Sequence, residues 1–268
     1  MKESSENILL IECNDDGILR LTLNDLDNKN ALSELMMQKL INAITESSKD
    51  NSIKVIVIAS TGNVFCSGHN LKEINEARKS DDNGESYYLE LFKTCSTLMQ
   101  LIVNCSKPVI AEVNGIATAA GCQLVASCDL AVSSNSAKFA TPGVNIGLFC
   151  STPMVALSRS VSKKDSMKML LTGDMINADE AKRISLINDF VSEKELTKSV
   201  MDLAEKISKK SASVVSIGKE AFYKQSELNL FDAYEYTSKV MTANTLNENA
   251  KEGIDAFLEK RDPNWRDM

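Results

Sequence analysis

Two loops of small residues are the stretches of this sequence where chemistry is most readily placed. One follows an apolar strand, residues 108–113, and runs through Asn114-Gly115 and the small residues 117–121 into a helical segment at Cys122. Free backbone N–H groups gather at a helix N-terminus, where partial positive charge collects. Because no large side chain intervenes, a ligand can approach this main chain closely.

Another loop of the same kind lies upstream, in N-V-F-C-S-G-H-N-L-K, residues 63–72. In chain order it is the first of the two loops, and the loop that contains residues 117–121 is the second. The strand at 53–60 ends there in a glycine-containing loop that opens a helix. Together the two loops could aim two N–H groups at one developing oxyanion. The alternative is that both are simply tight strand-to-helix turns.

The pairing of F-C-S-G-H-N-L-K-E with N-G-I-A-T-A-A-G-C-Q-L-V-A-S-C-D-L-A resembles the crotonase (enoyl-CoA hydratase/isomerase) superfamily, from about residue 9 to residue 265. The resemblance implies an α/β fold, a spiral of ββα units over residues 1–200. It also implies a helical C-terminal region, residues 201–268, for trimerisation and completion of the CoA pocket. The implied partners are an acyl-CoA thioester and further copies of the chain, as a homotrimer or a dimer of trimers. Coenzyme A enters as part of the substrate, and no separate cofactor is expected.

By this resemblance, the backbone N–H groups of His69 and Ala120 form an oxyanion hole for the thioester carbonyl, with Gly68 and Gly121 beside them. Removing one such donor costs about 3–4 kcal/mol of barrier in comparable sites. His69 is the only histidine of the chain. A role for its imidazole as an acid or base therefore stays open.

Two positions depart from the hydratases of this family, which activate water with two glutamates. Those glutamates follow Gly-Cys in the second loop and Pro in F-x-x-P-E; here the positions hold Gln123 and Gly143. An amide cannot shuttle a proton as a carboxylate does, and glycine has no side chain. The sequence therefore predicts an enoyl-CoA hydratase/isomerase family protein of fatty-acid or acyl-CoA metabolism with an atypical site, or a catalytically retired acyl-CoA-binding protein.

Further polar groups are placed near the acyl thioester by the spacing of the family, namely Asn145 and the run Cys150-Ser151-Thr152. A nucleophilic Cys150 or Ser151 would make the protein an acyl-CoA thioesterase, although no base is evident. The simpler interpretation is a core cysteine followed by helix-capping hydroxyls before Pro153.

For coenzyme A, the resemblance places Lys29 near the phosphates and Leu71 and Lys72 beside the adenine. Phe257 and Lys260 would reach the adenine pocket of a neighbouring subunit. Cations near a phosphate and an aromatic ring near a purine suit such a ligand.

Composition limits the partners and the compartment. The formal net charge is −7, which does not favour nucleic acid. The sequence contains no run of about 18 apolar residues, so no membrane span is predicted. Residues 1–7 show the features of neither a signal peptide nor an evident transit peptide. The 7 cysteines are scattered without metal-ligand spacing, as expected for buried reduced thiols. We expect the cytoplasm for a bacterial chain and the mitochondrial matrix for a mature eukaryotic one.

Periodicity alone predicts an α/β protein with short strands and a helical second half. The expected strands lie at residues 8–13, 18–23, 55–59, 109–113, 130–133, 138–140 and 187–191, and the expected helices at 31–48, 88–103, 121–127, 152–159, 164–171, 178–184, 193–210, 214–225, 231–246 and 250–260.

Overall fold

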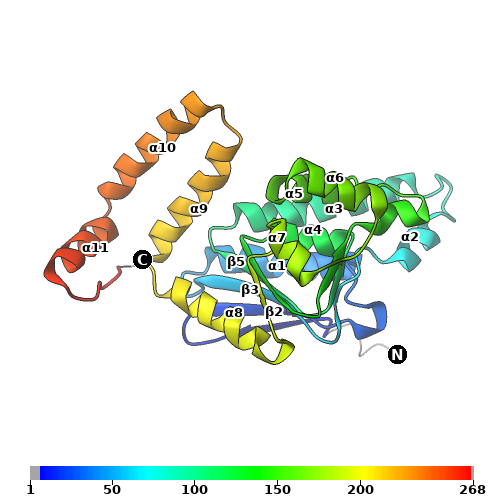
Figure 1. Cartoon of the computed structure of the whole chain (residues 1–268), viewed down its shortest axis with the longest axis horizontal. Coiled ribbons are helices and arrows are strands. Elements are labelled where there is room, and N and C mark those ends of the chain that lie inside the picture. The colour runs from blue at the N-terminus through cyan, green and yellow to red at the C-terminus, as the bar shows by residue number, and fades with distance from the viewer. Residues whose placement is uncertain (1–6, 267–268) are drawn as a thin grey trace.

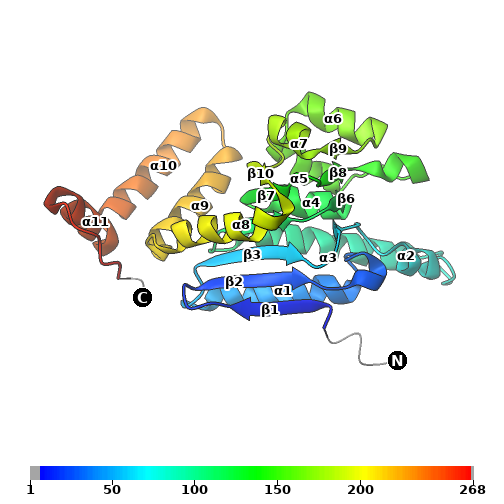
Figure 2. The same ribbon diagram turned by 60° about the horizontal axis from the view of Figure 1, so that its bottom comes forward.

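Two sheets form the body of the protein. The computed structural model describes residues 7–266, and Figures 1 and 2 show the arrangement. The larger sheet has six strands in the order β1-β2-β3-β5-β7-β10. Only β1 runs antiparallel to its neighbour. Its strands are β1 (Leu9–Cys13), β2 (Ile18–Leu23), β3 (Val55–Ser60), β5 (Val109–Val113), β7 (Leu130–Ser134) and β10 (Asp189–Val191).

The smaller sheet has four strands in the order β4-β6-β8-β9, with β4, β6 and β8 parallel. They are β4 (Val64–Cys66), β6 (Ile116–Thr118), β8 (Lys138–Ala140) and β9 (Ile176–Asn177). Three times in succession the chain adds one strand to the large sheet and the next to the small one. This repetition is the spiral of ββα units expected from the resemblance.

Helices cover both faces of the larger sheet. On one face lie α1 (Glu34–Lys49) and α3 (Glu85–Asn104), which bury Met36, Leu40 and Leu98 in the main core. Ser33 caps α1 by accepting a hydrogen bond from the Met36 N–H, as an N-terminal serine commonly does. On the other face α8 (Glu193–Ser208) packs Leu196, Val200 and Ala204 against Ile18, Val55, Val57, Ile110 and Val132.

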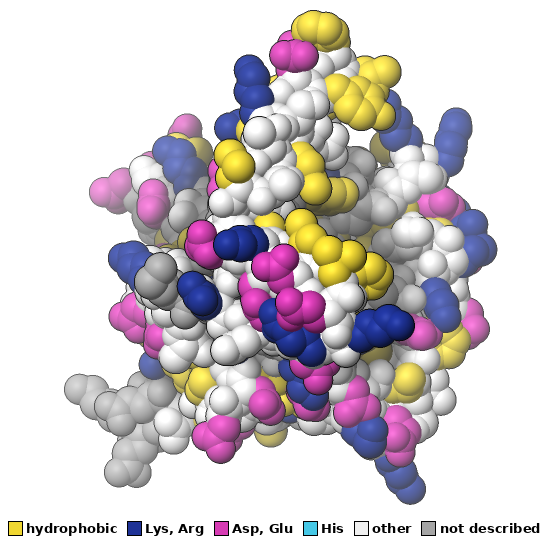
Figure 3. All heavy atoms as spheres, turned by 90° about the vertical axis from the view of Figure 1, so that its left-hand side faces the viewer, with side chains coloured by type: hydrophobic (Ala, Val, Ile, Leu, Met, Phe, Trp, Pro, Cys, Tyr) yellow, Lys and Arg dark blue, Asp and Glu magenta, His cyan; other side chains and the backbone are white. Residues whose placement is uncertain are grey.

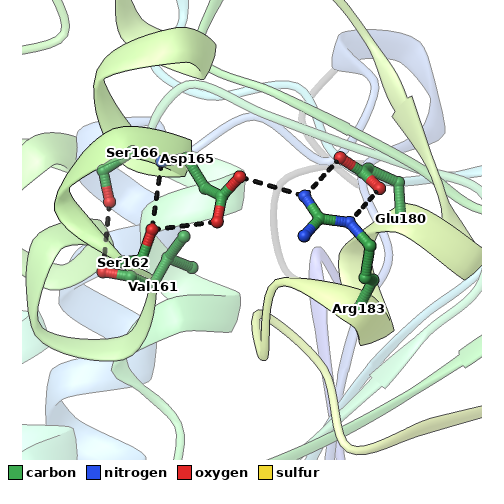
Figure 4. Close-up of polar contacts among 6 residues, drawn as sticks. All are labelled: Val161, Ser162, Asp165, Ser166, Glu180 and Arg183. Carbon is green, nitrogen blue, oxygen red and sulfur yellow. Dashed lines mark hydrogen bonds and ion pairs between the residues drawn. The ribbon is translucent and has the colours of Figure 1, made fainter.

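The short helices α5 (Pro153–Ser160) and α6 (Lys163–Thr172) lie between β8 and β9 in the chain, and α7 (Ala178–Arg183) follows β9. A polar network joins α6 to α7, as Figure 4 shows. Arg183 lies 3.0 Å from a carboxylate oxygen of Asp165 and 2.6 Å from one of Glu180. Ser162 caps α6 and donates to Asp165. These contacts hold two helices together and require no ligand.

The chain ends in an arm of three helices, α9 (Ala212–Ser226), α10 (Leu230–Thr245) and α11 (Glu248–Glu259), which extends away from the sheets (Figure 1). A buried ion pair anchors α9, since Lys219 Nζ lies 2.7 Å from Asp129 Oδ2. Tyr223 donates a hydrogen bond of 2.9 Å to the other oxygen of Asp129. Asp129, at the start of β7, therefore serves as a structural hydrogen-bonding group.

Large apolar side chains are exposed along this arm, and Figure 3 faces that end of the molecule. The exposed set includes Phe222, Leu230, Phe231, Tyr234, Met241, Leu246, Phe257 and Leu258. An open hollow of about 470 Å³ lies along α10, lined by the apolar Met241 and Leu246 and by the hydroxyl-bearing Ser238, Thr242 and Thr245. An apolar surface of this extent is typical of an interaction face.

Most predicted elements are confirmed within one to three residues of their bounds. The strands β4, β6 and β9 were missed. Each has three residues or fewer, and β4 and β6 lie within the two stretches interpreted as loops, whereas the equally short β8 was predicted. Two predictions concern residues outside the described range. One is the absence of a leader, and the other is the outer limits of the two domains, residues 1 and 268. Within residues 7–266 no helix combines the length and apolar character needed to cross a bilayer.

Candidate active site

The first of the two small-residue loops connects β4 to α2 (Leu71–Ala77). Its turn requires a left-handed backbone at Gly68, where φ is 97°, a conformation that glycine adopts without a Cβ penalty. Asn70 then caps α2 by accepting a hydrogen bond of 3.0 Å from the Lys72 N–H. His69 lies between the turn and the cap.

The second loop connects β6 to α4 (Ala120–Ser127). Ala119 stands at the N-cap with φ 50° and ψ −118°, a strained conformation for a residue with a Cβ atom. A hydrogen bond of 3.0 Å from the Ala119 N–H to the Ala140 carbonyl holds it in place. A Cβ atom on Gly121 would overlap the carbonyl oxygen of Cys66, so only glycine allows α4 to approach β4 this closely.

The two loops lie in direct contact. A Cβ atom built on Gly68 would be 2.9 Å from Ala119 Cβ and 3.3 Å from the backbone nitrogen of Ala120. Thr118 Oγ1 donates a hydrogen bond of 3.1 Å to the Ser67 carbonyl, which links the loops further. Within residues 7–266 the N–H groups of His69 and Ala120 have no hydrogen-bond acceptor. Two unpaired donors of this kind, one at a helix N-terminus, can hold an oxyanion.

The His69 imidazole is half-buried and fixed by its surroundings. Its Nδ1 lies 3.3 Å from the Leu32 carbonyl oxygen, so Nδ1 carries the proton of the neutral ring. The ring meets Phe92 edge to face, with centroids 5.6 Å apart. Burial lowers the pKa of His69, which keeps the ring neutral near pH 7. The buried Nε2 atom has no partner among the described residues.

The two positions at which the resemblance to hydratases implies glutamates contain no carboxylate, and they differ in the space available. Gln123 is buried on α4, and its amide oxygen lies 3.8 Å from the Cys95 thiol. Gly143 lies in the short helix η2 (Pro142–Ile146). A Cβ atom there would be 2.7 Å from the Leu148 carbonyl oxygen and 2.9 Å from Cys150 Sγ. The loop therefore closes over the glycine and leaves no room for a side chain.

The candidate nucleophiles are poorly placed for attack. Cys150 is buried and burial raises the pKa of its thiol, although the Gly143 N–H opposes this shift. The hydroxyl of Ser151 donates to the Phe149 carbonyl. Pro153 begins α5 as expected, but Thr152 occupies the N-cap without a side-chain capping bond. The amide of Asn145 lies against Gly173, just after α6.

The structure brings two of the predicted CoA-binding residues to one turn. Lys29 is the left-handed C-cap residue that follows η1 (Leu26–Asn28), and Lys72 Nζ lies 3.4 Å from Oδ1 of Asn28, the last residue of η1. Leu71 is exposed beside them. Phe257 and Lys260 lie on the arm, at the opposite end of the molecule from α2 (Figures 1 and 2). Within one chain they cannot contact the Lys29 region.

Two residues that contact the candidate site, Phe92 and Asn30, were not predicted from the sequence to contribute to it. Helical spacing directs Phe92 into the core, whereas in the structure it is partly exposed and contacts His69. Asn30 is fully buried beneath the first loop, and its left-handed backbone next to a left-handed Lys29 leaves no clear signal in the sequence. Among residues 7–266 no group of three or more His, Cys, Asp or Glu is arranged to hold a metal ion.

Comparison with known proteins agrees with this fold. Residues 14–268 match the family described as Enoyl-CoA hydratase/isomerase, and the chain belongs to that family, a branch of the crotonase superfamily. It is similar to the Xenopus laevis protein named enoyl-CoA hydratase domain-containing protein 3, mitochondrial. The identity is 48% over 249 residues, which cover 93% of this chain and 83% of the relative.

Two solved structures are similar over nearly the whole chain. The crystal structure of human enoyl Coenzyme A hydratase domain-containing protein 3 is 47% identical with a TM-score of 0.92, and covers 97% of this chain and 100% of its own. A structure described as enoyl-CoA hydratase from Mycobacterium smegmatis is 44% identical with the same TM-score of 0.92, over 97% and 99% of the two chains. The predicted family is thereby confirmed.

Proposed function

We propose that this protein binds an acyl-CoA thioester and polarises its carbonyl group through the backbone N–H groups of His69 and Ala120. The observation that carries the proposal is the contact between the two loops, with the Gly68 Cβ position 3.3 Å from the Ala120 nitrogen. Both donors are main-chain groups, so their placement depends on the fold and not on a particular side chain. An enolate formed from the thioester would gain negative oxygen at this point.

The proposed chemistry is that of the enoyl-CoA hydratase/isomerase family, carried out without the paired carboxylates that activate water. General acid–base help is worth about 10²–10⁴ in rate per group. With Gln123 and Gly143 at those positions, we expect hydration of an enoyl-CoA to be far slower than in a hydratase that carries both glutamates. Proton transfer would have to use water or His69 Nε2.

A catalytically retired acyl-CoA-binding or regulatory protein is the second candidate. The closure of the loop over Gly143 favours it, because this arrangement removes the space for a second carboxylate altogether. Thioesterase activity has less support. Cys150 is a buried thiol with a raised pKa, and the thiolate is the reactive form.

The apolar arm supports assembly into a homotrimer or a dimer of trimers. Phe257 is 82% exposed on α11. Because the arm lies at the opposite end of the molecule from α2, Phe257 and Lys260 could approach a CoA site only in a neighbouring subunit. Relatives named as mitochondrial support the mitochondrial matrix as the location of a eukaryotic chain. Light scattering of the purified protein tests the oligomer, with three or six chains expected and a monomer contradicting it.

Three assays on the purified protein separate the candidate functions. Loss of enoyl absorbance with crotonyl-CoA reports hydration, release of free CoA thiol reports hydrolysis, and calorimetry reports binding. We expect saturable binding, slow hydration and no hydrolysis. Binding with neither reaction would support the retired acyl-CoA-binding protein. Absence of binding to crotonyl-CoA and to longer acyl-CoA thioesters would contradict the proposal.

A further inference from the structure

Asn30 is fully buried and adopts a left-handed backbone, with φ 52°. Its side chain is fully committed to main-chain partners. Its Oδ1 accepts a hydrogen bond of 2.7 Å from the Asp25 N–H, and its Nδ2 donates to the carbonyl oxygens of Thr61 at 3.0 Å and Val64 at 2.7 Å. One amide therefore joins the η1 turn to the connection between β3 and β4.

The backbone on both sides of Asn30 supports the first loop of the candidate site. The Lys29 carbonyl accepts a hydrogen bond of 3.2 Å from the Ser67 N–H, and the Leu32 N–H donates one of 2.8 Å to the Gly68 carbonyl. The Leu32 carbonyl then binds the His69 imidazole. Three consecutive residues of the loop, 67–69, are thus held by the segment that Asn30 fixes.

We propose that Asn30 is a positioning residue of the oxyanion site, acting on the His69 N–H through residues 29–32. This inference rests on the proposed function, because it concerns the same pair of donors. Asn30 does not touch the thioester. A left-handed conformation is unfavourable for most residues with a Cβ atom, and asparagine is one of the few that adopt it; the three hydrogen bonds of the buried amide hold Asn30 in that conformation. An oxyanion donor must be aimed at the place where charge develops, so loosening this segment weakens polarisation of the carbonyl.

Two variants and one control separate positioning from general stability. Asn30→Gly accepts φ 52° readily and removes all three hydrogen bonds. Asn30→Ser is milder, because its short hydroxyl can replace only part of them. Asn83→Gly is the matched control, since Asn83 is also a left-handed asparagine, with φ 56°, in the exposed loop before α3. All three are first shown to be folded by urea unfolding.

The readout is the absorption band of 4-dimethylaminocinnamoyl-CoA, a thioester whose spectrum moves to longer wavelength when its carbonyl oxygen is pulled by hydrogen-bond donors. We expect a red shift on binding to the native protein and to Asn83→Gly. We expect Asn30→Gly to lose at least about half of that shift, and Asn30→Ser less, while the Kd changes by no more than about threefold.

A native-sized red shift in folded Asn30→Gly and Asn30→Ser would overturn the positioning role. A native complex that binds the probe with no red shift would instead overturn the proposed oxyanion site, so the two failures are distinguishable.

Discussion

A Cβ atom on Gly143 would lie 2.7 Å from the carbonyl oxygen of Leu148. Because the obstacle is a backbone atom, no rotation of a side chain relieves it. At Gly143 the chain therefore differs from the expected hydratase pattern in two ways: the carboxylate is missing, and the shape of the loop leaves no room for one. Gln123, in contrast, carries an amide side chain of nearly the same size as that of glutamate.

Restoring the two glutamates is expected to give an unequal result. Gln123→Glu should fold and raise crotonyl-CoA hydration modestly, whereas Gly143→Glu should destabilise the protein by about 2 kcal/mol or more through forced movement of the loop. Gly218→Glu, at an open position on α9, is the control for the added side chain. Urea unfolding and the enoyl absorbance assay measure both effects. A well-folded Gly143→Glu variant with full hydratase activity would contradict the crowding seen at this loop.

Gly68→Ala tests the contact between the two loops. The new methyl group would meet Ala119 Cβ at 2.9 Å and would also stand at a backbone φ of 97°, so we expect a loss of about 2 kcal/mol in unfolding free energy and weaker carbonyl polarisation. Gly147→Ala shares a positive φ of 78° but has nothing within 4 Å. Gly147→Ala should lose only the part of the unfolding free energy that comes from backbone strain, about 1 kcal/mol. Equal losses in the two variants would show that the loops do not press together.

His69 should produce a measurable pH dependence of stability. Its pKa is lowered in the folded state, so the unfolded chain binds the proton first as pH falls below about 6.5. The loss of unfolding free energy caused by His69 is therefore absent above about pH 6.5 and grows as the pH decreases. As this is the only histidine of the chain, His69→Gln should flatten the change in unfolding free energy between about pH 7.5 and about pH 5.5. Identical slopes in the native protein and the variant would contradict the lowered pKa.

The ion pair between Lys219 and Asp129, which anchors the helical arm, can be tested by replacing Lys219. Lys219→Met leaves the Asp129 carboxylate buried without its cation and should cost about 3 kcal/mol. Adding Asp129→Asn removes the stranded charge, so the double variant should be less destabilised than the sum of the single variants. Lys206→Met, at an exposed position on α8, should change stability by no more than about 0.5 kcal/mol. Additive losses at Lys219 and Asp129 would indicate that the pair is not coupled.

Most of the fold could be predicted, because long helices such as α1 and α8 carry a strong apolar period and β3 and β5 are short apolar runs. The bounds of β4, β6 and β9 could not, because strands of two or three residues have too few positions to show a period. Their pairing depends on contacts between distant segments.

The two loops of the site were found from their glycines and small residues, which are local features. The roles of Asn30 and Phe92 were not, since each depends on a partner far away in the sequence. Asn30 donates a hydrogen bond to the carbonyl of Val64 at the start of β4, and Phe92 leaves the expected core face of α3 to contact His69. Similarly, only coordinates could show that Gly143 is crowded by Leu148.

The most direct test of the central claim is a structure of the native protein with a non-hydrolysable acyl-CoA analogue bound. The account predicts the acyl carbonyl oxygen within hydrogen-bond distance, about 2.7–3.1 Å, of both the His69 and the Ala120 backbone nitrogens. A complex in which that oxygen contacts neither nitrogen, or in which side chains fill the space between the two loops, would contradict it.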